Sequence, residues 1–189
     1  MTPQETSTGA RLSRPGLRGR EAELAQLRAM VEAVRDGEGS GIALLLGEPG
    51  IGKTALLEET VSIARASGFA VSRGRAEELH ELAPLASLAS GLLHGDPPLL
   101  AAEDFAHLAG HHDQRVWLVE RLARLLEERS TDAPTMIAID DVQWTDQLSR
   151  FALNVMPARL LASPILWLLA GRENPDLRGG ATRMATLAL

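Results

Sequence analysis

The chain contains the stretch Gly47-Glu48-Pro49-Gly50-Ile51-Gly52-Lys53-Thr54, which fits the pattern G-x-x-x-x-G-K-T at every fixed position. Gly50 and Gly52 permit backbone angles that are closed to other residues, so that successive N–H groups can point inward at a phosphate. Lys53 can reach the β- and γ-phosphates of a nucleotide, and the Thr54 hydroxyl can bind Mg²⁺. The stretch therefore predicts a cradle for nucleotide phosphates.

The residues on both sides of this cradle support the prediction. Residues 42–46 read IALLL, a continuous apolar run typical of a strand that is covered on both faces. A helix is expected from about Lys53 to Ala66, with Gly68 ending it, and the N–H groups of its first turn favour an anion. The alternative, a chance glycine-rich turn, accounts for neither neighbour. The predicted nucleotide-binding residues of this region are Gly47, Glu48, Pro49, Gly50, Ile51, Gly52, Lys53, Thr54 and Ala55.

A second motif consists of four apolar residues followed by two acids, in the run Met136-Ile137-Ala138-Ile139-Asp140-Asp141. We expect Asp140 to hold Mg²⁺, mostly through water, because this ion keeps much of its hydration shell. Asp141 is expected to orient and polarise the attacking water. The alternative is that both acids only end a strand and cap the next helix. A complete phosphate cradle earlier in the chain favours the catalytic interpretation.

Arg172 follows another apolar run, at the carboxyl end of a strand, where ligands collect in open α/β sheets. A guanidinium suits phosphate, so Arg172 can sense the γ-phosphate. The alternative is a solvated or acid-paired arginine. The predicted catalytic residues are thus Lys53, Asp141 and Arg172, and the predicted metal ligands are Thr54 and Asp140.

Composition narrows the classes of function. The 189 residues carry a formal charge of −6, which argues against direct binding of duplex DNA by this segment. There is no cysteine, which excludes disulfides, thiolate catalysis and cysteine-ligated zinc and agrees with a cytoplasmic location. No apolar run is long enough to cross a bilayer, so no membrane partner is expected.

Apolar strands alternate with helices along the rest of the chain. This alternation predicts an α/β fold with a mostly parallel sheet and helices on both faces. Residues 1–14 are expected to be a disordered tail, and residues 15–189 a single nucleotide-binding domain. Helices are expected over about 17–35, in pieces between 77 and 109, over 114–128, and over 146–161 with Pro157 as a point of kink or break; further strands are expected over 69–73, 135–139, 165–169 and 184–189.

Two smaller features are given structural interpretations. His107 and His111 have a spacing that can bind metal on a helix, but Gly110 weakens a helix there, so we interpret them as ordinary histidines. The helix over 114–128 is amphipathic. Its expected core residues are Val116, Trp117, Val119, Leu122 and Leu126.

Four sequence motifs together resemble those of one known group of proteins. The phosphate cradle is one of them. The second is Leu17-Arg18-Gly19-Arg20-Glu21, which resembles the V-G-R-E motif at the start of these domains, and the third is Asp140-Asp141-Val142-Gln143-Trp144-Thr145-Asp146, which resembles their D-D-x-H/Q-W-A-D motif; the fourth, Leu168-Leu169-Ala170-Gly171-Arg172, resembles their sensor strand. The group is the STAND signal-transduction ATPases, related to AAA+ proteins. Over residues 16–189 the chain is most similar to the N-terminal ATPase domain of large LuxR-type (LAL) transcriptional regulators.

This resemblance implies a three-layer P-loop NTPase fold with strand order 5-1-4-3-2. It implies binding of ATP or ADP with Mg²⁺, and a contact of Arg20 on the base side of the nucleotide. It also implies a switch in which nucleotide state controls conformation or self-association. Relatives continue into a helical lid, a sensor region and a helix-turn-helix domain, which we expect to be the missing partners of this segment. Without the lid, weakened affinity and slow turnover are expected.

The sequence departs from the family in two places. Thr145 stands where alanine is usual, and Gly171 precedes Arg172 where relatives often have threonine or serine. Two other functions remain open, a stand-alone small-molecule phosphotransferase and a non-hydrolysing nucleotide-binding scaffold. A GTPase is disfavoured because the sequence has no Asn-Lys-x-Asp motif, which recognises guanine.

Overall fold

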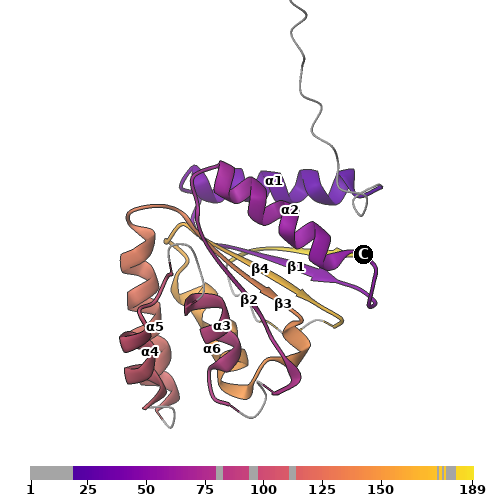
Figure 1. Cartoon of the computed structure of the whole chain (residues 1–189). Helices are drawn as coiled ribbons and strands as arrows, with labels where there is room; N and C mark the ends of the chain where they lie inside the picture. Colours follow the sequence, from indigo (N-terminus) through magenta and orange to yellow (C-terminus); the bar gives the residue numbers. More distant parts are fainter. Residues whose placement is uncertain are drawn as a thin grey trace, which may run out of the picture.

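The computed structural model describes residues 19–79, 83–93, 98–110, 114–173, 175, 177 and 182–189. Its centre is a five-stranded sheet in the order β2-β3-β4-β1-β5 (Figure 1). Counted from the other edge, this order is 5-1-4-3-2, so the predicted order is confirmed. Every pairing in the sheet is parallel. The expected tail over residues 1–14 lies outside the described residues. The strands are β1 (Gly41–Leu46), β2 (Ala70–Arg75), β3 (Thr135–Asp140), β4 (Ile165–Gly171) and β5 (Arg183–Ala188).

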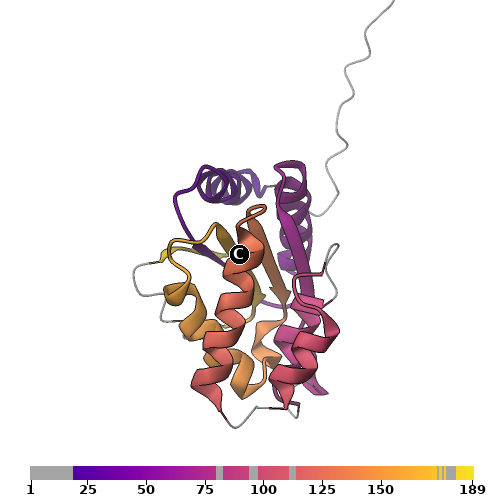
Figure 2. The ribbon, with the colours of Figure 1, turned by 90° about the vertical axis from the view of Figure 1, so that its left-hand side faces the viewer.

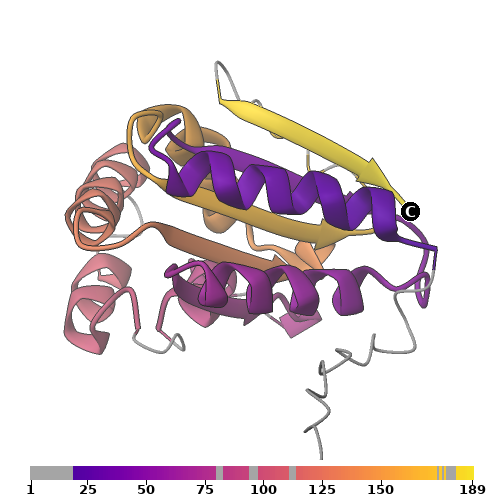
Figure 3. The same ribbon diagram turned by 90° about the horizontal axis from the view of Figure 1, so that it is seen from above.

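Two layers of helices enclose this sheet. On one face lie α1 (Glu21–Arg35) and α2 (Lys53–Ala66), which run side by side along the strands (Figure 3). The other face is covered by α3, α5 and α6, and α4 packs beside α5 at the outside of this layer (Figure 2). The bounds of these helices are Ala86–Leu93 for α3, Ala102–Ala109 for α4, Arg115–Ser130 for α5 and Gln147–Arg159 for α6.

The central strands are apolar throughout because both of their faces are buried. In β4, Ile165, Trp167 and Leu169 pack under α5 and α6, while Leu166 and Leu168 pack under α1 and α2. Successive side chains of a strand point to opposite faces, so a strand between two helical layers has no polar side. All seven residues of β4 are buried.

The strand register brings three loops to one edge of the sheet. β4 lies between β1 and β3, with Leu46 opposite Gly171 and Ile139 opposite Leu169. The phosphate cradle follows β1, Asp141 follows β3, and Arg172 follows β4. These segments therefore meet at the carboxyl edge, where open α/β sheets bind their ligands.

The structure corrects some expected details. Val116 and Trp117 were expected in the core but have exposures of 72% and 38%, because they lie in the first turn of α5 and its buried stripe begins at Leu118. Pro157 does not break α6, which continues to Arg159. The strand β2 continues two residues beyond the expected end, to Arg75. In the described part of the chain, no helix is both long and apolar enough to cross a lipid bilayer.

The histidines have a structural role where they can be described. The ring of His107 lies edge-on to Trp117 of α5, with ring centres 5.9 Å apart. His111 lies outside the described residues. Among the residues that the structure describes, no group of three or more acidic, histidine or cysteine side chains is placed to hold a metal ion.

Candidate functional site

The phosphate cradle links β1 to the first turn of α2, and its lysine is folded into it. Lys53 is 7% exposed, and its ammonium donates hydrogen bonds to the carbonyl oxygens of Gly47 at 2.8 Å and Glu48 at 2.9 Å. Gly50 and Gly52 have φ angles of 81° and 103°, the left-handed region that glycine adopts at no steric cost. The first turn of α2 carries no acidic residue, so its N–H groups and dipole favour an external anion.

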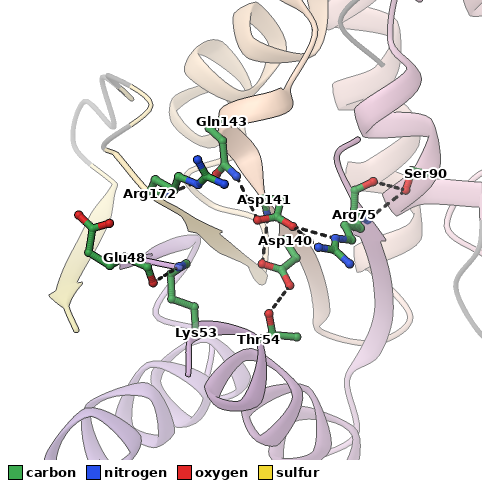
Figure 4. A network of polar contacts seen from close by, with 9 residues as sticks. All are labelled: Glu48, Lys53, Thr54, Arg75, Ser90, Asp140, Asp141, Gln143 and Arg172. Atoms are coloured by element: carbon green, nitrogen blue, oxygen red, sulfur yellow. Dashed lines mark hydrogen bonds and ion pairs between the residues drawn. The ribbon is translucent and has the colours of Figure 1, made fainter. Parts of the chain in front are cut away.

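Thr54 and Asp140 meet although they are far apart in the sequence. The Thr54 hydroxyl donates to Asp140 Oδ2 at 2.7 Å, and Asp140 Oδ1 accepts the Asp141 N–H at 2.9 Å (Figure 4). Asp140 is only 3% exposed, so both hydrogen bonds fix its carboxylate. A hydroxyl and a carboxylate beside a phosphate cradle fit Mg²⁺, which takes one or two protein oxygens together with waters and substrate phosphates.

Asp141 adopts a backbone conformation that few residues tolerate, with φ 56° and ψ 41°. Aspartate and asparagine adopt this left-handed region more readily than other non-glycine residues. Its Oδ1 accepts from Gln143 Nε2 at 3.0 Å, and its Oδ2 accepts from Arg75 Nε at 2.8 Å and Nη2 at 2.6 Å. Such backbone strain is typical of functional positions.

The surroundings of Asp141 keep its carboxyl group ionised. Burial raises the pKa of Asp141, but the hydrogen bonds from Gln143 and Arg75 and the charges of Arg75 and Lys53 act in the opposite direction and together exceed it. The pKa of this carboxyl therefore lies below its ordinary value. At neutral pH the side chain is an acceptor on both oxygens, as an acid that orients a water must be.

Gln143 connects Asp141 to the end of β4. While its Nε2 donates to Asp141, its Oε1 accepts the backbone N–H of Arg172 at 3.2 Å. A Cβ on Gly171 would lie 2.7 Å from Val142 Cγ2 and 3.3 Å from Gln143 Oε1. Glycine therefore fits at position 171 in this chain, where a threonine or serine would push against Val142 and Gln143.

A cavity of about 480 Å³ collects most of the predicted site. This volume is in the range of ordinary ligand pockets. Eight predicted residues line it: Pro49, Gly50, Gly52, Lys53, Thr54, Ala55, Asp141 and Arg172. Gly47 and Glu48 contribute the carbonyls that hold Lys53, and Asp140 is joined to the cavity through Thr54. Ile51 lies on the cradle and is 41% exposed.

Arg20 is the predicted residue that the structure does not bring to this cavity. Its Nη1 donates to Glu23 Oε1 at 2.8 Å, one turn along α1, and it is not part of the cavity lining among the described residues. Two lining residues, Arg75 and Trp144, had no predicted role. Trp144 and Gln143 lie inside the motif that begins at Asp140, and this motif is the sequence signal that could have identified them. Arg75 has no comparable signal.

Asp146, the last acid of the motif that begins at Asp140, has a structural role. Asp146 is 3% exposed and caps α6, with Oδ1 accepting from Ser149 N at 2.9 Å. The same carboxylate accepts from Leu85 N at 2.9 Å and Ser87 N at 3.2 Å, which lie at the start of α3. Leu85 has a positive φ of 63°. Asp146 thus fixes the entry to α3 against the loop that carries Asp141.

Replacing Asp146 with alanine is expected to lower the free energy of unfolding by about 3 kcal/mol, because the change leaves buried N–H groups without an acceptor. Urea denaturation followed by circular dichroism measures this loss. Asp36→Ala is the matched control, since the Asp36 side chain is 60% exposed and lies beyond the end of α1. A loss of less than about 1 kcal/mol for Asp146→Ala would contradict the structural role.

Comparisons with known proteins agree with this fold. Residues 16–168 match the model of the family described as the AAA ATPase domain. Among solved structures, the chain is similar to the ORC2 protein of Aeropyrum pernix, described as ADPNP-ADP complexes, with TM-score 0.57, 17% identity, and coverage of 95% of this chain and 50% of that one. It is also similar to Cdc6p of Pyrobaculum aerophilum, with TM-score 0.62, 17% identity, and coverage of 95% and 47%.

The chain thus spans about half the length of these two structures, and at such identity they show the fold alone. No curated protein matches the chain in sequence. The family model covers most of the chain, including the phosphate cradle and the two acids, Asp140 and Asp141, at the end of β3. The chain belongs to the AAA ATPase domain family.

Proposed function

We propose that this domain binds ATP with Mg²⁺ at the carboxyl edge of its sheet and hydrolyses it slowly. The observation that carries the proposal is the single cavity in which Lys53, Thr54 and Asp141 lie together, with Asp140 held to Thr54 at 2.7 Å. Phosphoryl transfer requires positioning and neutralisation of charge more than covalent chemistry. A cation, a hydroxyl and an ionised acid in one cavity, with a buried carboxylate bonded to the hydroxyl, suit these needs.

Each side chain has a defined task in this proposal. Thr54 and Asp140 would hold the Mg²⁺, which would supply neutralisation of phosphate charge. Lys53 turns from the carbonyls of the cradle to the β- and γ-phosphates. Asp141 orients the water whose oxygen attacks the γ-phosphorus as the bond to the leaving ADP oxygen breaks. Arg172 meets charge on the γ-phosphate from the end of β4.

We further propose that the ATPase serves regulation, as a switch domain of a LuxR-type transcriptional regulator. This proposal rests on the sequence motifs at Asp140–Asp146 and Leu168–Arg172, which resemble those of LAL regulators. Nucleotide state then controls the conformation or self-association of attached domains. The formal charge of −6 makes direct DNA binding by this segment unfavourable, so DNA contact belongs to another domain. The lack of cysteine fits a reducing cytoplasmic setting.

One titration series tests the binding step. ATP, ADP and GTP are titrated calorimetrically with and without Mg²⁺, while light scattering follows the mass of the protein. We expect ATP to bind more tightly with Mg²⁺ than without it, and GTP to bind less tightly than ATP. A rise in mass with ATP, and not with ADP, would support nucleotide-linked self-association.

Other results would favour other functions. Absence of ATP binding with Mg²⁺ would contradict the proposal as a whole. Binding without phosphate release above background would favour a non-hydrolysing scaffold. Rapid ATP-dependent phosphorylation in a screen of small acceptors would favour a phosphotransferase.

A further inference from the structure

Arg75 lines the cavity and carries a positive charge for which the proposed mechanism has no task. It is the last residue of β2, opposite Asp140 in the strand register. Its Nε and Nη2 both donate to Asp141 Oδ2, at 2.8 Å and 2.6 Å (Figure 4). The side chain thus reaches from the edge strand of the sheet to the acid that orients water.

The ion pair between Arg75 and Asp141 is easily exchanged. The Arg75 side chain is 69% exposed, and that of Asp141 is 22% exposed. Ion pairs so accessible to water contribute little to stability, because the solvent screens both charges. The guanidinium can therefore leave the carboxylate for a stronger anion.

The backbone that carries Arg75 is held in place. The Arg75 N–H donates to Ser90 Oγ at 3.1 Å, and this hydroxyl donates back to the Arg75 carbonyl oxygen at 3.1 Å. The preceding Gly74 packs closely on α3, so that a Cβ there would lie 2.6 Å from Gly91 Cα. Any exchange of partner is accordingly a movement of the side chain on a fixed strand end.

An arriving ATP changes the balance of charge beside Asp141. Its terminal phosphate enters a cavity whose wall already includes this carboxylate, and two anions at close range repel. A guanidinium can donate the same pair of parallel hydrogen bonds to a phosphate as to a carboxylate. We propose that Arg75 passes from Asp141 to the terminal phosphate of ATP and so recognises ATP over ADP; this rests on the ATP binding proposed above.

This exchange couples binding to catalysis. ADP lacks the terminal phosphate, so Arg75 stays on Asp141 when ADP is bound. When ATP is bound, Asp141 Oδ2 loses its cation and is free to accept a hydrogen bond from water. The same arginine thereby stabilises the phosphate that reacts and releases the acid that acts on it.

The test uses Asp141→Asn as its background, because that change removes the carboxylate and is expected to slow hydrolysis enough for binding to be measured. Dissociation constants for ATP and ADP with Mg²⁺ are measured calorimetrically for Asp141→Asn and for Asp141→Asn with Arg75→Ala. Loss of the guanidinium is expected to reduce the preference for ATP over ADP roughly tenfold, the effect of one charge-assisted hydrogen bond to phosphate. Arg75→Lys keeps the positive charge but not the paired N–H donors of the guanidinium. It is expected to retain part of the preference for ATP over ADP.

Arg73→Ala in the same background is the matched control. Arg73 lies on the same strand, pairs with Glu58 at 2.9 Å and does not line the cavity, so its loss is expected to leave the preference unchanged. Thermal unfolding verifies that each variant is folded. If Arg75→Ala leaves the preference for ATP unchanged, the exchange is wrong although the proposed ATP binding stands. If the wild-type protein binds neither nucleotide in the presence of Mg²⁺, both the exchange and the proposed ATP binding are wrong.

Discussion

Replacing Lys53 with alanine is expected to weaken ATP binding by at least about 100-fold, since hydrogen bonds between an ammonium and phosphate are among the strong, charge-assisted ones. Lys53 is positioned for this role by its burial and by the carbonyls of Gly47 and Glu48, which hold its ammonium at the cradle. Arg75 and Arg172 line the same cavity but lie at the ends of other strands, so neither replaces Lys53 at the cradle. Calorimetric titration with ATP and Mg²⁺ measures the effect.

The matched control for Lys53 is a basic residue outside the cavity. Arg65→Ala removes one positive charge from the last turn of the same helix, α2, and is expected to leave ATP affinity close to wild type. Lys53→Arg is informative as well, because it keeps the charge in a larger group that the narrow cradle accommodates poorly. ATP binding by Lys53→Ala at wild-type affinity would show that the cradle is not the phosphate site.

Replacing Asp141 with asparagine is expected to slow hydrolysis by at least about 100-fold while ATP binding is kept, because a positioned general base contributes a factor of this order or more. Asparagine tolerates the left-handed backbone at this position, and its single amide oxygen can accept from either Gln143 or Arg75, which donate to separate oxygens of Asp141. The substitution therefore removes the negative charge and one of these two hydrogen bonds, while the backbone conformation is kept. Phosphate release at saturating ATP and Mg²⁺ is the measurement.

An equal loss of charge elsewhere provides the comparison for Asp141. Asp36 is exposed at the end of α1, where its carboxylate pairs with Arg35, and Asp36→Asn is expected to leave the rate unchanged. A wild-type rate for Asp141→Asn would contradict its role in orienting water. Loss of binding together with rate would instead assign Asp141 to nucleotide binding.

The sequence was most informative where local chemistry determines the structure. The helix α2 has the bounds expected from the cradle and from Gly68, which has a φ of 87° just past its end. The strands were recognisable because burial on both faces leaves a continuous apolar run, as in β4. Asp140 and Thr54 were assigned to one metal site from their motifs, and the structure brings them within hydrogen-bonding distance.

The missed features depend on contacts between distant residues. Arg75 meets Asp141 across 66 positions of sequence, and an arginine after a glycine at the end of a strand has no local pattern that indicates this. The expected strand over 69–73 left out Gly74, whose missing side chain admits α3 in the structure. Val116 and Trp117 were misplaced because periodicity does not reveal where a neighbouring helix stops covering α5.

The buried ammonium of the cradle also has a chemical consequence, since Lys53 is the only lysine among the 189 residues. An amine-selective reagent has no other side chain to modify, and at Lys53 it meets a group that is 7% exposed and already hydrogen-bonded to Gly47 and Glu48. The extent of labelling at this residue, read by mass spectrometry, is thus a direct record of how open the cradle is. A bound nucleotide that draws the ammonium onto its phosphates would protect it, so the chain has a built-in footprint for its own ligand.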